Sequence, residues 1–337
     1  ASSLDSRLSA KSEALNVFMA GFVGDLHSLA DNPYIIEATR EFTGAWTILG
    51  TGQKDYLHAA YITKNANATG KKHLLDAAND DSLYSKTHAK YHPYMREFVL
   101  EHGYYDMFLV DAAGNVIYTM YKEPDFATNL NDGEWKDSGL AKVFKGAMAQ
   151  KDAEQVSYAD FTPYAPSNNV PAGFIGRPIE DDAGHRLGVL IYQLPIDKLS
   201  ALFDDEKQMG ATGKIYLVGE DYLLRNNVRF AKEPTILTLK LETEQAKQAL
   251  AGVSGISMDT HNAEGTHVIT AYRPHSFTGT KYALIFEINY DEVMAQVYKA
   301  RQHFLLLTAI AVGVLSVLGI LLARSITRPI GRITTLM

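Results

Sequence analysis

The chain has 337 residues, carries a net charge of −7 and contains no cysteine. The lack of cysteine excludes disulfide bonds, thiolate zinc sites and a cysteine nucleophile. The acidic balance argues against nucleic-acid binding, which needs a basic patch.

The first 50 residues are predicted to form a long N-terminal helix. Apolar residues recur at helical spacing from Leu4 to Trp46. Asn32-Pro33 should kink this helix, because proline lacks the N–H for a helical hydrogen bond. Residue 1 lies inside the helical pattern, so we expect an anchor further upstream; a start produced by signal cleavage is the alternative.

Two more helices and a sheet are predicted next. The helices cover residues 57–79 and 85–102, and Gly103 is expected to cap the second. The spacing then changes to that of strands, with a short helix over residues 138–150. The strands are expected at 106–110, 116–121, 155–160, 172–179 and 188–194.

The same order of elements recurs weakly between residues 201 and 298. Met107–Val110 resembles Ile215–Val218, each followed by a turn and a second strand, and a helix is predicted over residues 243–250. Arg177-Pro178 aligns with Arg273-Pro274. Two copies of one α+β module are the economical interpretation, and chance similarity of two meanders is the alternative. The predicted domains are a stalk helix (1–50) and two modules (51–200 and 201–298).

The C-terminal part contains a predicted transmembrane helix, placed at residues 303–323. Phe304–Ala323 has no charged residue, and about 20 apolar residues span a hydrocarbon core of about 30 Å. A buried core helix is the alternative, although such a helix usually carries a polar stripe. Arg324, Arg328 and Arg332 follow the span and mark the cytoplasmic side. Residues 1–302 are therefore expected outside a bacterial inner membrane, and residues 324–337 inside.

Several motifs resemble those of a known family. Ser325–Ile330 (SITRPI) resembles the opening of a HAMP linker, and the runs Tyr91–Arg96, Gly103–Asp111 and Tyr121–Phe126 are similar to outer domains of methyl-accepting chemotaxis proteins. The chain therefore resembles a bacterial double-Cache sensor. The resemblance implies an α+β fold with a long N-terminal helix, two PAS-like Cache modules with antiparallel sheets, one transmembrane helix (303–323) and the start of a HAMP linker (324–337).

A HAMP linker implies a homodimer and a helical seam. The residues expected on that seam are Ile326, Ile330, Ile333 and Met337, at spacings of 4, 3 and 4. A juxtamembrane amphipathic turn is the alternative. Ligand binding would be transmitted as a small helix shift.

The resemblance also implies a ligand pocket in the first, membrane-distal module. The residues that it selects are Tyr118, Trp135, Tyr158, Asp160, Tyr164 and Gln193. Asp160 could hold a cation, and Lys122 or Arg177 an anion; the alternative is that the aromatic residues belong to the core. Amino-acid-binding members have Arg, Tyr and Asp where this chain has Gly133, Lys136 and Gln193. We therefore expect that free α-amino acids do not bind in the usual manner.

A chemoreceptor is the predicted function. The alternatives are the sensor half of a histidine kinase or of a nucleotide or diguanylate cyclase, and a membrane-anchored binding protein without output. The predicted partners are a small molecule or a ligand-bearing periplasmic protein, and cytoplasmic signalling proteins. No phosphate loop, HExxH or GxSxG motif occurs. His88 and His92 have metal-ligand spacing, but no third ligand is apparent, so no cofactor, metal or catalytic residue is predicted.

Overall fold

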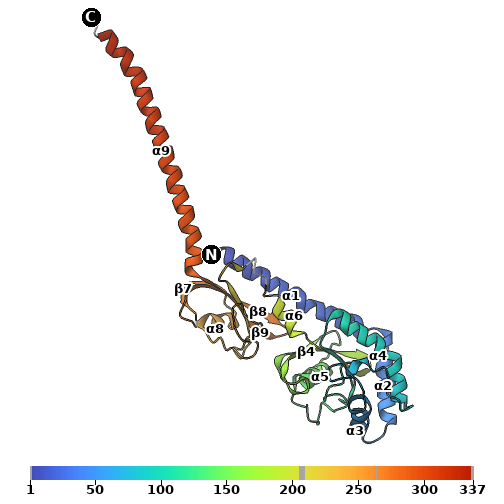
Figure 1. The fold of residues 1–337 in the computed structure, drawn as a ribbon. Coiled ribbons are helices and arrows are strands. Elements are labelled where there is room, and N and C mark those ends of the chain that lie inside the picture. The colour runs from blue at the N-terminus through green and yellow to red at the C-terminus, as the bar shows by residue number, and fades with distance from the viewer. Residues whose placement is uncertain (1, 205–208, 263, 335–337) are drawn as a thin grey trace. The chain divides into compact units, whose positions relative to one another are not determined.

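The computed structural model describes residues 2–204, 209–262 and 264–334 (Figure 1). The chain forms two compact units, described separately below. The first contains residues 1–208, 214–256 and 271–286, and the second contains 209–213, 257–270 and 287–337. The predicted α+β fold with a long N-terminal helix, two antiparallel sheets and a C-terminal membrane-type helix is confirmed.

The N-terminal helical region of the first unit is two helices, α1 (Ser2–Ala30) and α2 (Pro33–Ile48). The predicted kink at Asn32-Pro33 is a full break. Asn32 caps α2 by accepting a hydrogen bond from the Tyr34 N–H (2.9 Å), and Pro33 occupies the first helical position, where its missing N–H costs nothing.

The predicted helix over residues 57–79 is wrong, apart from its beginning. Helix α3 (Gln53–His58) continues as one π-helical turn, η1 (Ala59–Thr63), and only a 3-10 turn, η2 (Lys72–Leu74), follows. Asn65 ends the helix by donating from its side-chain amide to the carbonyls of Tyr61 (2.9 Å) and Lys72 (3.0 Å). Its side-chain oxygen accepts from the Asn67 N–H, a local turn that competes with helix formation.

The next helix agrees with the sequence prediction. Helix α4 (Leu83–His102) begins at Ser82, whose hydroxyl accepts a hydrogen bond from the Ser85 N–H (3.0 Å). It ends at Gly103, which has the left-handed conformation (φ 68°) that an L-residue rarely adopts.

The first sheet has five antiparallel strands in the order β2-β1-β5-β4-β3. They are β1 (Asp106–Asp111), β2 (Val116–Thr119), β3 (Ser157–Tyr164), β4 (Val170–Glu180) and β5 (Arg186–Gln193). Helix α5 (Gly139–Ala149) packs over β3, β4 and β5 and buries an apolar core with Phe108, Phe174 and Ile191. Helices α1, α2 and α4 also contact the sheet (Figure 1).

The second sheet has the strand order β6-β9-β8-β7. Its strands are β6 (Lys214–Val218), β7 (Gly255–His261), β8 (His267–Phe277) and β9 (Thr280–Asn289). This order reproduces β1-β5-β4-β3 of the first sheet, as expected for a repeated module. Helix α8 (Glu244–Leu250) takes the place of α5 in the chain order. The short elements η3 (Ala165–Ser167) and α6 (Ile196–Ala201) lie before it.

The second strand predicted after β6 is not formed in the described chain. Only isolated bridges occur there, joining Val218 to Leu224, Leu223 to Lys240 and Leu224 to Ile236. Tyr222, just before Leu223 and Leu224, has φ 64°. This left-handed conformation interrupts the extended backbone that a strand requires.

Helix α9 (Tyr290–Thr334) is one continuous helix in the second unit (Figure 1). Its segment Tyr290–Leu322 is long and apolar enough to cross a membrane, and the most apolar 18 consecutive residues in it have a mean hydropathy of 2.8. Near its start, Glu292 accepts hydrogen bonds from the N–H groups of Ala211 and Thr212, both at 2.8 Å. The side chains of the predicted seam (Ile326, Ile330, Ile333 and Met337) lie outside the described residues.

Candidate functional site

A cluster of three carboxyl groups lies at one end of the first sheet. Asp106 is fully buried at the start of β1, opposite Gln193 at the end of β5. One of its oxygens, Oδ1, accepts hydrogen bonds from the backbone N–H groups of Met107 (2.7 Å), Met120 (2.8 Å) and Tyr121 (3.2 Å). The turn that follows β2 is therefore tied to the first residue of β1.

The other two carboxyl groups come from the segment after β2. Glu123 accepts hydrogen bonds from the hydroxyls of Tyr105 (2.9 Å) and Ser167 (2.5 Å). The fully buried Asp125 accepts one at Oδ2 from the Tyr164 hydroxyl (2.7 Å). Asp106, Glu123 and Asp125 are called the acidic cluster below. Repulsion within the cluster raises the pKa values of Asp106 and Asp125.

Lys122 interacts electrostatically with Asp106 of the acidic cluster. Its side chain is buried, and its ammonium donates to the Thr119 carbonyl and lies 4.4 Å from the Tyr118 ring centroid. Rings of Phe126 and Tyr61 lie 5.1 and 5.8 Å away. Lys122 also has φ 60°, a conformation that costs free energy outside glycine and often marks a functional site.

Burial disfavours the charged forms of all these groups. It raises the pKa of Asp125 to about 7 and that of Asp106 well above its usual range. Repulsion by Glu123 raises both pKa values further, and repulsion by Asp125 adds to that of Asp106. The pKa of Glu123 is also raised by burial. Burial lowers the pKa of Lys122 to about 7, although the attraction of Asp106 acts to raise it. When all four groups are ionised, their summed charge is −2.

Two buried acceptors of this region have no hydrogen-bond partner among the described residues. They are Asp125 Oδ1 and Gln193 Oε1, on side chains that are 0% and 1% exposed. An unsatisfied buried acceptor costs about 1–3 kcal/mol, so such atoms are rare in folded proteins. Their presence in the same region indicates a site for a hydrogen-bond donor.

His88 and His92 both belong to the packed interface between α4 and its neighbours. The two rings stack with centroids 4.3 Å apart. His92 Nδ1 accepts from the Tyr118 hydroxyl (2.7 Å), and its Nε2 donates to the His73 carbonyl (2.6 Å). Burial lowers the pKa of His92 to about 2, so the imidazole is neutral. Within residues 2–204, 209–262 and 264–334, no group of three potential metal ligands converges.

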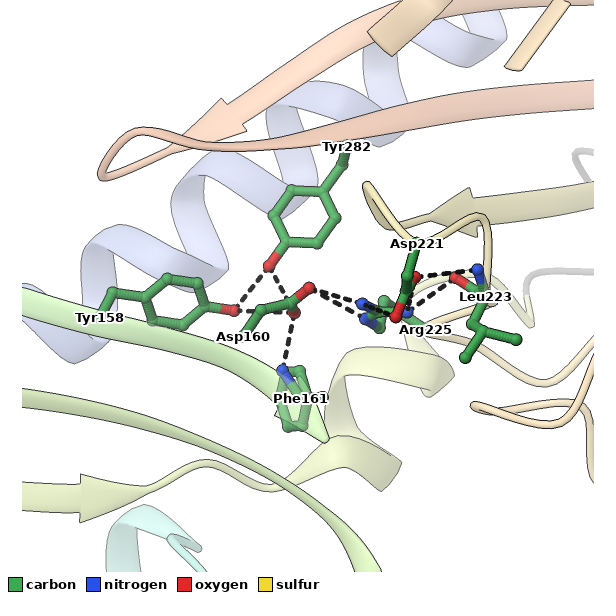
Figure 2. Close-up of polar contacts among 7 residues, drawn as sticks. All are labelled: Tyr158, Asp160, Phe161, Asp221, Leu223, Arg225 and Tyr282. Carbon is green, nitrogen blue, oxygen red and sulfur yellow. Dashed lines mark hydrogen bonds and ion pairs between the residues drawn. The ribbon is translucent and has the colours of Figure 1, made fainter. Parts of the chain in front are cut away.

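Asp160 lies in a different polar network, shown in Figure 2. Its Oδ1 accepts hydrogen bonds from the Tyr282 hydroxyl and the Phe161 N–H, both at 2.7 Å. Its Oδ2 accepts two from Arg225, at 2.7 and 3.1 Å. The Tyr158 hydroxyl lies 2.7 Å from that of Tyr282.

Arg225 connects Asp160 to a second carboxylate (Figure 2). The Arg225 side chain is only 3% exposed and also donates to Asp221 (3.0 and 3.1 Å) and to the Leu223 carbonyl (2.8 Å). Since two carboxylates and a carbonyl surround the guanidinium, its buried charge is fully compensated. The pair Asp160–Arg225 joins β3 to the turn after β6.

The residues expected to form the pocket therefore occupy two places. Tyr164 and Gln193 contact the acidic cluster or its hydrogen-bonded neighbours, and Lys122 interacts with Asp106. Tyr118 lies beside Lys122, and Trp135 Nε1 donates to the Pro124 carbonyl (3.4 Å), next to Asp125. Tyr158 and Asp160 belong to the Arg225 network instead.

Arg177, the alternative anion site, is also already paired. It is 2% exposed and donates to Asp31 (2.8 Å) and Glu154 (2.7 Å).

Gly133 stands where the amino-acid-binding proteins that this chain resembles have an arginine. An arginine does not fit on this backbone, because a Cβ at Gly133 would lie 2.3 Å from the Asn129 carbonyl oxygen.

The sequence prediction missed the acidic cluster. Asp106 and the motif Glu123-Pro124-Asp125 lie inside two of the runs that carry the resemblance, but charged residues at strand ends are usually solvated. The sequence contains one signal for the cluster: Glu123 and Asp125 flank Pro124 and directly follow Lys122.

Among the cavities of the first unit, one of about 380 Å³ lies on the segment that precedes α4. Its lining includes Tyr56, Lys64, Asn65, Asn79 and Asp80. Another, of about 260 Å³, is lined by residues that include Trp46, Lys54, Asn129 and Glu134. Neither is lined by a residue of the acidic cluster.

Comparison with known proteins identifies one matching family. The dCache_1 profile, described as a Cache domain, matches residues 37–297. No curated protein has a sequence significantly similar to this chain.

Solved structures with similar folds include the V. cholerae histidine kinase DctB sensor domain (11% identity, 83% of this chain and 94% of that chain, TM-score 0.48). An extracellular ligand binding receptor from Desulfohalobium retbaense has 11% identity over 84% of this chain and 39% of that chain (TM-score 0.46). The ligand-binding domain of the Pseudomonas fluorescens chemoreceptor CtaA, in complex with L-isoleucine, has 14% identity over 59% and 74% (TM-score 0.39).

The first prediction concerns Asp125. Its pKa rises from 3.8 in the unfolded chain to about 7 in the folded chain, so ionisation destabilises the fold as the pH rises through 7. Asp125→Asn should therefore increase the free energy of unfolding at pH 8 by up to about 4 kcal/mol, and this gain should vanish as the pH falls toward 4. Thermal unfolding of the full chain in detergent at several pH values measures this. The exposed Asp132→Asn is the control, and a gain independent of pH would contradict the assignment.

The second prediction concerns the Arg225 network. Asp160→Ala removes a carboxylate that accepts from Arg225, Tyr282 and Phe161, and it should destabilise the protein by about 3 kcal/mol. Asp221→Ala removes a 45% exposed partner of the same arginine and should cost less than about 1 kcal/mol. Equal losses in a thermal unfolding assay would show that the two carboxylates are equivalent.

Proposed function

The chain belongs to the Cache domain family, and we propose that it is the extracytoplasmic sensor of a membrane-anchored signalling protein. The family match covers residues 37–297, and the helix that follows is long and apolar enough to cross a membrane. In this proposal residues 51–200 form the membrane-distal module and residues 201–298 the proximal one. Residues 1–302 lie outside the bacterial inner membrane, and residues 324–337 lie in the cytoplasm.

The proposed output is chemotaxis signalling by a homodimer through a HAMP linker. The motif Ser325–Ile330 after the membrane helix resembles the opening of a HAMP linker and supports the linker. Helix α9 is continuous from Tyr290 to Thr334, so a displacement at its start would reach the cytoplasmic side without a break. The bonds from Ala211 and Thr212 to Glu292 couple the first turn of α9 to residues 209–213.

The proposed ligand site is the acidic cluster with Lys122, Tyr164, Gln193, Tyr118 and Trp135. The observation that carries this proposal is the pair of unsatisfied buried acceptors, Asp125 Oδ1 and Gln193 Oε1. Aromatic walls with a few converging polar groups are typical of small-molecule sites. We leave Tyr158 and Asp160 out of the site, since the oxygens of Asp160 already accept four hydrogen bonds from protein donors.

The third prediction tests the membrane topology and uses the absence of native cysteine. A single cysteine at Asp182, in the exposed turn between β4 and β5, should react with a membrane-impermeant maleimide in spheroplasts. A single cysteine at Thr327 should react only after the membrane is permeabilised. The opposite pattern would reverse the orientation, and labelling of both without permeabilisation would exclude that α9 crosses the membrane.

The fourth prediction tests the ligand site. A thermal-shift screen of the full chain in detergent should find small metabolites that raise the melting temperature, because a ligand at 100 times its Kd stabilises by about 2.7 kcal/mol. Asp125→Asn should abolish that shift, whereas Asp221→Ala should retain it. Equal shifts in both variants would place the ligand outside the acidic cluster.

A further inference from the structure

We propose that the ligand of the acidic cluster is an organic cation, a protonated amine that carries no carboxylate. The inference rests on the proposed sensor function and specifies the chemistry of its ligand. It is based on three observations: the excess of carboxyl groups over cations, the two unsatisfied acceptors, and the lack of an available anion anchor.

The charges of the cluster favour a cationic ligand. Asp106, Glu123 and Asp125 interact electrostatically with one another, and Lys122 interacts with Asp106. The ammonium of Lys122 is already engaged by the Thr119 carbonyl and the Tyr118 ring. A ligand with one or two ammonium groups would compensate the remaining negative charge, whereas an anion would increase the repulsion.

The hydrogen-bond directions also require a donor. The Ser167 hydroxyl has one proton, which it donates to Glu123 (2.5 Å), so it accepts from the Gln193 amide nitrogen (3.2 Å). This orientation leaves Gln193 Oε1 as the unsatisfied atom, and Asp125 Oδ1 is the other. An ammonium offers up to three N–H donors and has no acceptor that would remain unsatisfied.

The surroundings argue against a carboxylate on the ligand. Gly133 has no room for an arginine side chain, and Arg177 is held by Asp31 and Glu154. An amino-acid carboxylate would therefore face the acidic cluster without a free guanidinium at either position. Aromatic rings such as Tyr105 and Tyr121, whose centroids are 5.6 Å apart, instead suit a cation.

A metal ion fits the described residues less well than an amine. No group of three Asp, Glu, His or Cys side chains in the described ranges is close enough to hold one metal ion. One unsatisfied atom is an amide oxygen, Gln193 Oε1, whereas Oδ1 of Asp106 is occupied by three backbone donors. The acceptor atoms of this site belong to different strands and turns. They therefore suit an organic ligand whose N–H donors are separated in space.

The test is isothermal titration of the full chain in detergent with four probes of similar size. They are 1,4-diaminobutane, n-butylamine, 4-aminobutanoate and 1,4-butanediol. We expect the two amines to bind at least tenfold more tightly than the zwitterion and the diol. Asp125→Asn should weaken amine binding at least tenfold, and Asp221→Ala should leave it unchanged. Since Asp125→Asn is expected to stabilise the fold, loss of binding in this variant cannot result from unfolding.

The remaining outcomes separate the inference from the proposed function. Preferential binding of 4-aminobutanoate or of the diol, lost in Asp125→Asn, would overturn the cationic ligand and retain the site. Amine binding that is unchanged in Asp125→Asn would overturn the site itself. Failure of both amines to bind at about 10 mM would overturn the inference.

Discussion

The burial of Asp106 and Asp125, with the half-buried Glu123 and the buried Lys122 beside them, is the constraint on which this sensor module depends. Asp106 ties the start of β1 to the turn after β2 through three backbone bonds, and Glu123 and Asp125 anchor Tyr105, Ser167 and Tyr164. Ionising Asp106 and Asp125 without a further cation is unfavourable, so these two carboxyl groups retain protons in the ligand-free cluster at pH 6. A cationic ligand would supply the missing charge and order the same segments, which would couple its binding to the conformation of the module.

The Arg225 network has a different role. It compensates a buried guanidinium with two carboxylates and connects β3 with the turn after β6, residues that are 65 positions apart in the sequence. Tyr158 and Tyr282 add hydroxyl contacts at the same carboxylate (Figure 2). This network connects β3 with β9 and with the turn after β6 inside the first unit. Its contribution is to the stability of the fold.

Sequence periodicity predicted most of the fold but only part of the candidate site. Helix α4 and the meander β3-β4-β5 were predicted from spacing and turn residues. The prediction of a helix over residues 57–79 was wrong, because the Asn65 side chain forms hydrogen bonds to backbone carbonyls in place of helical bonds. Tyr164 and Gln193 were selected by resemblance alone, and Lys122 was selected for its charge. The partners of Asp160 could not be predicted, because Arg225 and Tyr282 are distant in sequence and no spacing rule connects them.

The most direct measurement of the central claim is the number of protons exchanged when 1,4-diaminobutane binds. Titration calorimetry at pH 6, in buffers with different ionisation enthalpies, gives this number. Since burial holds protons on the carboxyl groups of the free cluster, the account predicts that binding releases protons, and that Asp125→Asn reduces the release. Binding with no proton release, or with proton uptake, would contradict it.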